Sequence, residues 1–466
     1  MAEIITASLE DYLIDGLSFK LGKTASYVQN RRFVSYHPQG SNIYSTNGTK
    51  LIKFHISGSD WLDPQTFRVV FDLVNSDATP GRKLRPIGGP WSFFQRLRVL
   101  SGGVVVEDLD LYHRTHEMFS LFTSEGSRIN DLSEGFCNTW EYRHPDTSDP
   151  EKVTAEDIGG INPSESMTVC FKLLSGLLRQ PKFLPLRYLP LTIELTLVDD
   201  PFLPIVSIVT STRSGPTTNF TDANTSRSWQ IQNAMVKCDL ITLDSGLNES
   251  YAKVLEEGKK LTINYNTFVS QIQTIAGQTN IQVSLTRSLT RLKSVFYSLI
   301  KDYAEPGRAS MATSKPWNDF FSPMSPNVTN GILNYDDDGE FETQLAIGSK
   351  VFPEYPIRSH RESYYQLNKT LGMRANELHS FNIKGPEYHK TKMVVSIDTE
   401  KVIQAGFTGL NSRSTGDLMV VRFKYAPKVI DGTATVSAER IAQAMHIVMN
   451  CDNILEIHDI GVRVYD

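Results

Sequence analysis

The chain has 466 residues, of which 40% are apolar and 21% charged, and its formal net charge is −5, which is typical of a globular protein with two or three domains. Because its basic residues form no block, it lacks the dense positive charge of a protein that coats nucleic acid directly. Its four cysteines are far apart and form no CxxC, which argues against a disulfide framework, and neither a signal peptide nor a membrane-spanning helix is expected.

The first part of the chain predicts an arm followed by a set of strands. Residues 1–49 contain turn signals and few periodic runs, which is typical of an N-terminal arm. A helix is predicted after Asp110, a suitable N-cap, and long polar loops are predicted over 125–165 and 199–228. Apolar alternation and β-branched residues predict strands at Leu51–Ile56, Phe67–Val74, Trp91–Leu100, Val104–Leu109, Met167–Leu174, Leu191–Val198 and Trp229–Leu243.

The second part repeats this order. A helix is predicted near Ser359–Leu371, after a long loop over 301–340. Strands are predicted at Leu261–Tyr265, Ile281–Leu285, Leu289–Ile300, Phe341–Ile347, Met393–Ile397 and Leu418–Tyr425, with a split terminal pair at Ile441–Val448 and Ile454–Val464. Both parts therefore show strands, one helix and more strands, which predicts a duplicated all-β module. The predicted fold is two tandem eight-stranded antiparallel jelly rolls, over 50–243 and 244–466, each with a short helix and long loops.

Residues that could carry chemistry are few. His113 and His116 lie three apart on the predicted helix, but the HExxH pattern of zinc enzymes is absent, and we interpret them as part of a solvated or interface face. Asp336–Asp338 lacks the alternating ligands of a calcium loop and is interpreted as a solvated turn. We therefore predict no catalytic, cofactor-binding or metal-binding residue, and no enzyme.

Four segments of the sequence resemble a known family. The double jelly-roll major capsid proteins of polinton-type elements, adintoviruses, polinton-like viruses and virophages show the same types and order of residues, and the wider lineage includes PRD1 and adenovirus. The resemblance covers nearly the whole chain. Its most telling parts are FFQRLRVLSGGVVVEDLDLYHRTHEMF, FLPLRYLPLTIELTLVDD, WQIQNAMVKCDLITLDS and IGSKVFPEYPIRSHRESYYQLNKTLG.

The resemblance implies a structural role in the virion. Two similar modules in each of three chains would form a pseudo-hexagonal capsomer that tiles the facets of an icosahedral shell around double-stranded DNA. The expected partners are a homotrimer, neighbouring capsomers, a single jelly-roll penton protein and minor capsid proteins, with an internal membrane left open and no direct nucleic-acid contact. We expect the loop aromatics Trp317, Phe320 and Phe321 to mediate contacts between subunits, and Arg31 and Arg32 to contact minor capsid proteins or an inner layer.

Two alternatives stay open at this point. One is a trimeric viral spike or carbohydrate-binding β-sandwich, which would need a groove with solvent-facing aromatic residues. The other is a bicupin-type enzyme, which needs a cluster of metal-binding histidines on the strands of one barrel. The ten histidines of this chain are dispersed along the sequence.

Overall fold

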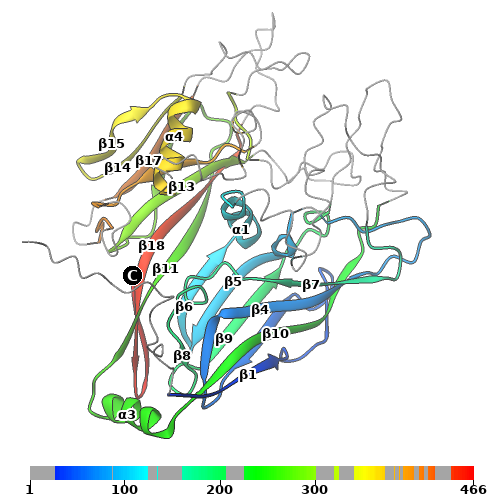
Figure 1. The fold of residues 1–466 in the computed structure, drawn as a ribbon. Helices are drawn as coiled ribbons and strands as arrows, with labels where there is room; N and C mark the ends of the chain where they lie inside the picture. The colour runs from blue at the N-terminus through cyan, green and yellow to red at the C-terminus, as the bar shows by residue number, and fades with distance from the viewer. Residues whose placement is uncertain are drawn as a thin grey trace, which may run out of the picture.

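The computed structural model describes residues 27–86, 88–123, 134, 160–205, 225–300, 320–324, 341–372, 383, 388, 392–402, 409–413, 418–425 and 442–466. These residues form four antiparallel sheets, which face each other in two pairs (Figure 1). In the part of the chain described here, no helix is long and apolar enough to cross a membrane.

The first pair of sheets forms the first roll. One sheet has the order β1 (Val28–Tyr36), β10 (Trp229–Leu243), β4 (Trp61–Asn75), β7 (Ser166–Phe171), with the short strands β2 (Ile43–Tyr44) on β10 and β8 (Leu184–Pro185) on β4. The facing sheet has the order β3 (Leu51–Ile56), β9 (Leu191–Leu197), β5 (Phe94–Ser101), β6 (Val104–Asp110).

The second pair forms the second roll. One sheet has the order β11 (Leu261–Thr274), β18 (Ala444–His458), β13 (Leu292–Ile300), β16 (Val395–Asp398), with β19 (Gly461–Tyr465) on β18. The facing sheet has the order β12 (Asn280–Leu285), β17 (Met419–Tyr425), β14 (Phe341–Ile347), β15 (Lys350–Ile357).

The two rolls share one topology. When the eight main strands of each roll are numbered along the chain, without β2, β8 and β19, both rolls have one sheet in the order 1-8-3-6 and the other in the order 2-7-4-5. This arrangement, in which successive strands alternate between the two sheets except for the hairpin of strands 4 and 5, is the jelly roll. The prediction of two tandem eight-stranded antiparallel jelly rolls is confirmed.

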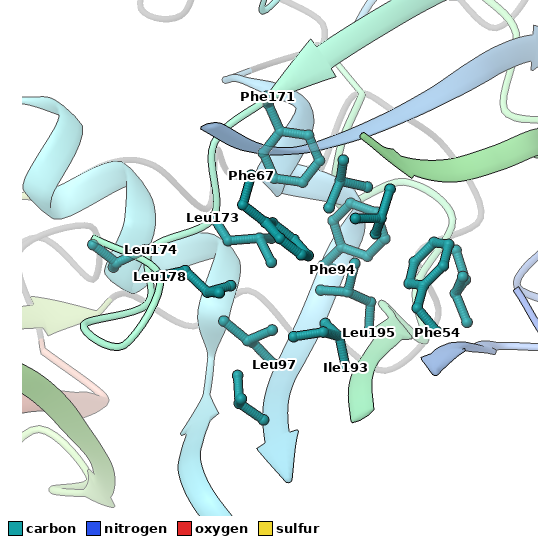
Figure 2. Packing of buried hydrophobic residues seen from close by; sticks show 14 of the residues in the cluster. Phe54, Phe67, Phe94, Leu97, Phe171, Leu173, Leu174, Leu178, Ile193 and Leu195 are labelled. Atoms are coloured by element: carbon teal, nitrogen blue, oxygen red, sulfur yellow. The ribbon is translucent and has the colours of Figure 1, made fainter. Parts of the chain in front are cut away.

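Each roll buries alternate side chains between its sheets. In β9 every second residue is buried, from Leu191 to Leu197, as expected for a strand with one face on a core. Aromatic rings fill much of the first core, where Phe54, Phe67, Phe94 and Phe171 are seen in Figure 2. The rings of Phe71, Phe94 and Phe171 lie with centroids 5.8–6.1 Å apart. Such contacts add to the free energy of area burial, which is about 25 cal/mol per Å² of apolar surface.

Three α-helices complete the described structure: α1 (Tyr112–Ser120), α3 (Ser245–Glu256) and α4 (His360–Thr370). The predicted helix near 359–371 is confirmed as α4, and the Ser359 hydroxyl accepts a hydrogen bond from the Glu362 backbone N–H at 3.1 Å. Helix α3 was not predicted. It connects the rolls, and the Asp244 side chain caps its first turn by accepting from the Gly246 N–H at 3.0 Å.

Several local predictions are wrong. The predicted strand Trp91–Leu100 starts only at Phe94, because Pro90–Phe93 form a 3-10 helix. Residues 28–36, predicted as part of an arm, form β1 and pair with β10; their side chains are mostly exposed, so the sequence carries no apolar alternation there. Asp110 is not the cap of α1, because Leu111 occupies the N-cap in a left-handed conformation with φ of 47°. The predicted terminal pair is one continuous strand, β18, followed by the short β19. Residues 1–26 lie outside the described residues, and the predicted boundaries 50–243 and 244–466 stay predictions.

Candidate functional site: the joint between the two rolls

Helix α1 lies between the two rolls (Figure 1). Its residues from Tyr112 to Met118 are all buried, although four of them are His113, Arg114, His116 and Glu117. Of the two environments predicted for this face, the solvated one is wrong, whereas burial between the two rolls agrees with an interface face. Burying polar and charged groups costs free energy unless each finds a partner, so the partners of this helix define the site.

The side of α1 that faces the first roll is held by Trp91. The indole ring stacks on the His116 imidazole with centroids 4.1 Å apart and an angle of 15°. The indole Nε1 donates a hydrogen bond of 2.9 Å to Glu117 Oε2, and His116 Nε2 donates to the Lys172 carbonyl at 3.2 Å. One tryptophan therefore provides both an apolar contact and a hydrogen-bond donor to the helix.

The opposite side of α1 contacts the second roll through Arg114. Its guanidinium donates to Ser298 Oγ at 3.2 Å and to the Leu299 carbonyl at 3.0 Å, both on β13. The same guanidinium lies 4.4 Å above the centre of the Phe320 ring, a cation–π contact. Near it, Thr115 Oγ1 and His446 Nε2 of β18 lie 3.4 Å apart.

The imidazoles at this joint are held neutral. Burial, followed by the nearby Arg114 charge, lowers the pKa of His113 to about 3. Burial and Arg179 lower the pKa of His116 to about 3, and burial with Arg114 lowers the pKa of His446 well below its ordinary value. A second positive charge beside Arg114 would be poorly solvated here, because the site is away from water.

A second contact between the rolls is centred on Glu107. Its buried carboxylate accepts hydrogen bonds from the Ser175 hydroxyl, from the Gly176 N–H at 2.8 Å and from the Leu177 N–H at 3.4 Å. Burial raises the pKa of Glu107, an effect that these donors oppose. The turn that Glu107 fixes comes so close to β11 that a Cβ at Gly176 would lie 1.7 Å from the carbonyl oxygen of Asn266.

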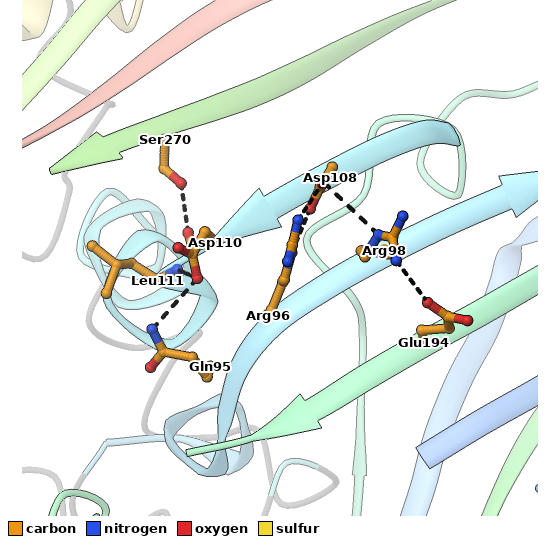
Figure 3. A network of polar contacts seen from close by, with 8 residues as sticks. All are labelled: Gln95, Arg96, Arg98, Asp108, Asp110, Leu111, Glu194 and Ser270. Atoms are coloured by element: carbon orange, nitrogen blue, oxygen red, sulfur yellow. Dashed lines mark hydrogen bonds and ion pairs between the residues drawn. The ribbon is translucent and has the colours of Figure 1, made fainter. Parts of the chain in front are cut away.

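Strand β11 runs along the first roll before it enters the second. Tyr265 donates a hydrogen bond of 3.0 Å to the Val106 carbonyl, and Ser270 donates one of 2.6 Å to the Asp110 carbonyl (Figure 3). Between these two residues, the Phe268 ring lies with its centroid 4.3 Å from that of Phe119 on α1. The joint is thus built from α1, the 175–177 turn and β11, and its arrangement fixes the relative orientation of the two rolls.

The joint residues were not identified as a site from the sequence. Arg114 and Ser298 are 184 positions apart and Thr115 and His446 are 331 positions apart, so no local pattern connects them. The polarity of the run Tyr112–Glu117 by itself does not distinguish a solvated face from a buried interface.

The predicted interface residues have three different outcomes. Phe320 and Phe321 are buried in the core of the second roll, so the prediction that they are exposed loop aromatics is wrong. Trp317 lies outside the described residues. Arg31 is paired with Asp63 and Asp239, and Arg32 with Asp60; both arginine side chains are 55% exposed, and their contact with another protein stays a prediction.

No metal centre is found among the residues that the structure describes, since no three His, Cys, Asp or Glu side chains group around a common point there. Asp336–Asp338 lies outside those residues. His113 and His116 instead contact protein groups at the joint.

Comparison with known proteins gives matches in structure. No protein-family model and no curated protein matches the chain. The chain matches PBCV-1 VP54 with TM-score 0.58 and 12% identity, over 96% of this chain and 98% of VP54. The VP54 coordinates are a crystal structure that was fitted into a cryo-EM reconstruction of the virophage Sputnik. A chain of the Sputnik virophage matches with TM-score 0.55 and 13% identity, over 97% and 92%. The Faustovirus major capsid protein matches with TM-score 0.53 and 10% identity, over 96% and 93%. This chain therefore shares its double jelly-roll fold with these viral proteins across nearly its full length.

Proposed function

We propose that this chain is a major capsid protein, which forms pseudo-hexagonal homotrimers that tile the facets of an icosahedral shell around double-stranded DNA. The observation that carries the proposal is the repetition of one jelly-roll topology twice in a single chain. Three such chains around a three-fold axis present six similar rolls, and a nearly six-sided outline packs on a flat lattice. The fold shared with the Faustovirus major capsid protein over nearly its whole length supports the same function.

The joint gives this proposal a mechanical basis. A tile keeps a six-sided outline only if the two rolls of each subunit hold a fixed relative orientation. Buried groups that bond across the rolls, such as Arg114 with Leu299 and Tyr265 with Val106, resist a change in that orientation because breaking them leaves polar atoms unpaired in the interior.

A trimer of identical chains needs two different surfaces that fit each other, because a three-fold ring is closed by heterologous contacts. Exposed apolar side chains occur on both rolls. Phe33 and Ile43 are 65% and 50% exposed at one edge of the first roll, whereas Tyr355 and Tyr365 are 80% and 59% exposed on β15 and α4 of the second. We place the trimer contact between these two surfaces, with about 2,000–5,000 Å² buried at each interface.

The same function implies further partners, namely neighbouring capsomers, a single jelly-roll penton protein and minor capsid proteins. It also implies that the protein is located in the virion. Arg31 and Arg32 are proposed as contacts to the minor proteins, because half of each side chain stays accessible beside its ion pair.

Light scattering and negative-stain microscopy of the purified full chain test the proposal. The expected result is a trimer of about 157 kDa, three times the 52.4 kDa chain, with a pseudo-hexagonal outline. Phe33→Asp and Tyr355→Asp should each reduce the trimer fraction without lowering the midpoint of thermal unfolding of the monomer. A stable monomer or two-fold dimer at virion-like concentrations would contradict the proposal. A trimer with three separate lobes that binds glycans on an array would favour the spike alternative.

A further inference from the structure

Helix α3 connects the two rolls at one end of the molecule (Figure 1). An apolar cavity of about 570 Å³ lies beside it, lined in part by Leu247 and Tyr251 of α3. Its wall combines the first roll, the connecting helix and the two long strands of the second roll. The lining residues are Tyr27, Val28, Trp61, Pro181, Lys182, Phe183, Pro185, Leu243, Leu247, Tyr251, Leu261, Thr262, Ile263 and Ile457. Among them only Lys182 carries a charge, so the cavity suits an apolar occupant.

The wall is held by side-chain contacts, while its rim is exposed. Trp61 packs on Tyr251 with ring centroids 4.9 Å apart, and its indole donates a hydrogen bond of 3.0 Å to Asn248 Oδ1 of α3. At the rim, Tyr27 is 62% exposed, and Val28 and Phe183 are each 37% exposed. Large apolar side chains gathered around an open cavity mark a binding surface.

The chain itself leads to this rim. Tyr27 lines the cavity, and its carbonyl accepts a hydrogen bond of 2.8 Å from the Asp244 N–H at the start of α3. Tyr27, the first residue that the structure describes, therefore lies at the mouth of the cavity. Just upstream, Leu17, Phe19 and Leu21 alternate with Ser18 and Lys20, so an extended segment here would carry one apolar side.

We propose that residues 17–21 of the same chain fold back into this cavity, with Phe19 as the main anchor. The five residues from 22 to 26 span up to about 17 Å when extended, and Gly22 tolerates the conformations of a reversal. A segment tethered at the rim has a high local concentration, which favours it over a second copy or another protein. Once bound, it contacts both rolls and α3 together.

Two lysines allow the docking to be measured on the full chain. Lys20 is next to Phe19, and Lys182 lines the cavity. An amine cross-linker should join Lys20 to Lys182 in the unmodified protein. Phe19→Asp should reduce the yield of this link about tenfold, which corresponds to about 1.4 kcal/mol. The matched control Ser18→Asp, which adds the same charge to the opposite side of the segment, should leave it unchanged.

Two further measurements make the outcome decisive. Leu247→Asp changes the cavity instead of the segment and should lower the yield of the Lys20–Lys182 cross-link to the same extent. The hydrogen-exchange rate of the α3 amides should rise in Phe19→Asp but not in Ser18→Asp. Equal link yields in the two segment variants would overturn the proposal. A second test co-expresses a Lys20→Arg chain with a Lys182→Arg chain, so that a Lys20–Lys182 cross-link can form only between two copies. A cross-link in that sample would also overturn the proposal, because the occupant of the cavity would then come from a second copy.

Discussion

Gly176 lies so close to Asn266 that a Cβ at position 176 would be 1.7 Å from the Asn266 carbonyl oxygen. Gly176 belongs to the turn fixed by Glu107 in the first roll, and Asn266 belongs to β11 in the second. The two backbones therefore touch at this point, and only a residue without a side chain fits between them.

Gly176→Ala should consequently push the turn away from β11. We expect a loss of about 1–3 kcal/mol in the free energy of unfolding, as for other overpacked positions, measured by urea denaturation. Gly58→Ala is the matched control, since the nearest atom to a Cβ at Gly58 is 3.9 Å away. Equal stability of the two variants would mean that the rolls do not meet as described.

Arg114→Ala should also weaken the joint. The change removes the donors to Ser298 and Leu299 and leaves space above Phe320, at an expected cost of about 2–4 kcal/mol. Arg114→Lys should recover little, because an ammonium lacks the planar set of donors that reaches both acceptors. Thermal and chemical denaturation measure the effect, with the exposed Arg463→Ala as control. Full stability of Arg114→Lys would show that charge alone matters here.

Acid should destabilise the chain through its buried histidines. The pKa values of His113, His116 and His446 are lower in the folded chain than the ordinary value near 6.5, so the unfolded chain binds more protons. Stability is thus complete above pH 6.5 and falls as the pH drops toward 3, by at most about 1.4 kcal/mol per pH unit for each histidine. Glu107 opposes the trend, because burial raises its pKa.

The slope of unfolding free energy against pH between 6.5 and 4.5 measures this effect. His116→Gln should reduce the slope by about one proton relative to the unmodified chain. The same substitution at the exposed His37 is the control for the chemical change from imidazole to amide. An unaltered slope in His116→Gln would show that this imidazole is already accessible to protons.

The ion pairs on the outer face of β5 and β6 should matter much less than the joint (Figure 3). Arg96 binds Asp108 through two hydrogen bonds of 2.7 Å, but the arginine side chain is 44% exposed to water. Asp108→Asn should cost less than about 1 kcal/mol. The cost should shrink in 1 M salt, where charges are screened within about 3 Å. A larger loss that salt does not reduce would point to a packing role instead.

The sequence was most informative where local pattern and tertiary environment agree. Strands β3, β10 and β14 have the predicted bounds because their apolar residues alternate and one face covers a core. Helix α4 was predicted from its apolar spacing, and Ser359 caps it. Helix α3 was missed, although Asp244 as a cap and the series Leu247, Tyr251, Leu255 carry a readable signal.

Prediction failed where distant partners override local preference. Asn450, Asp452 and Asn453 read as a turn, yet they lie inside β18, where Asn266 donates to Asp452 Oδ1 at 3.0 Å and Arg291 donates to the Asp452 carbonyl at 3.0 Å. The burial of α1 has the same origin. Its polar residues are satisfied by groups that only the assembled rolls supply, so sequence periodicity describes the helix but not its environment.

The long strands β11 and β18 take part in both hydrophobic cores. Ile263 and Leu455 belong to the core of the first roll, whereas Met449 and Cys451 of β18 belong to that of the second. Their pairing is unbroken from Leu261–Ile457 to Thr274–Ala444. Neither half of the polypeptide therefore forms a complete hydrophobic core by itself. A fragment cut at residue 243 would expose apolar surface that the other half normally covers. Each half should melt only together with the other, as a single thermodynamic unit.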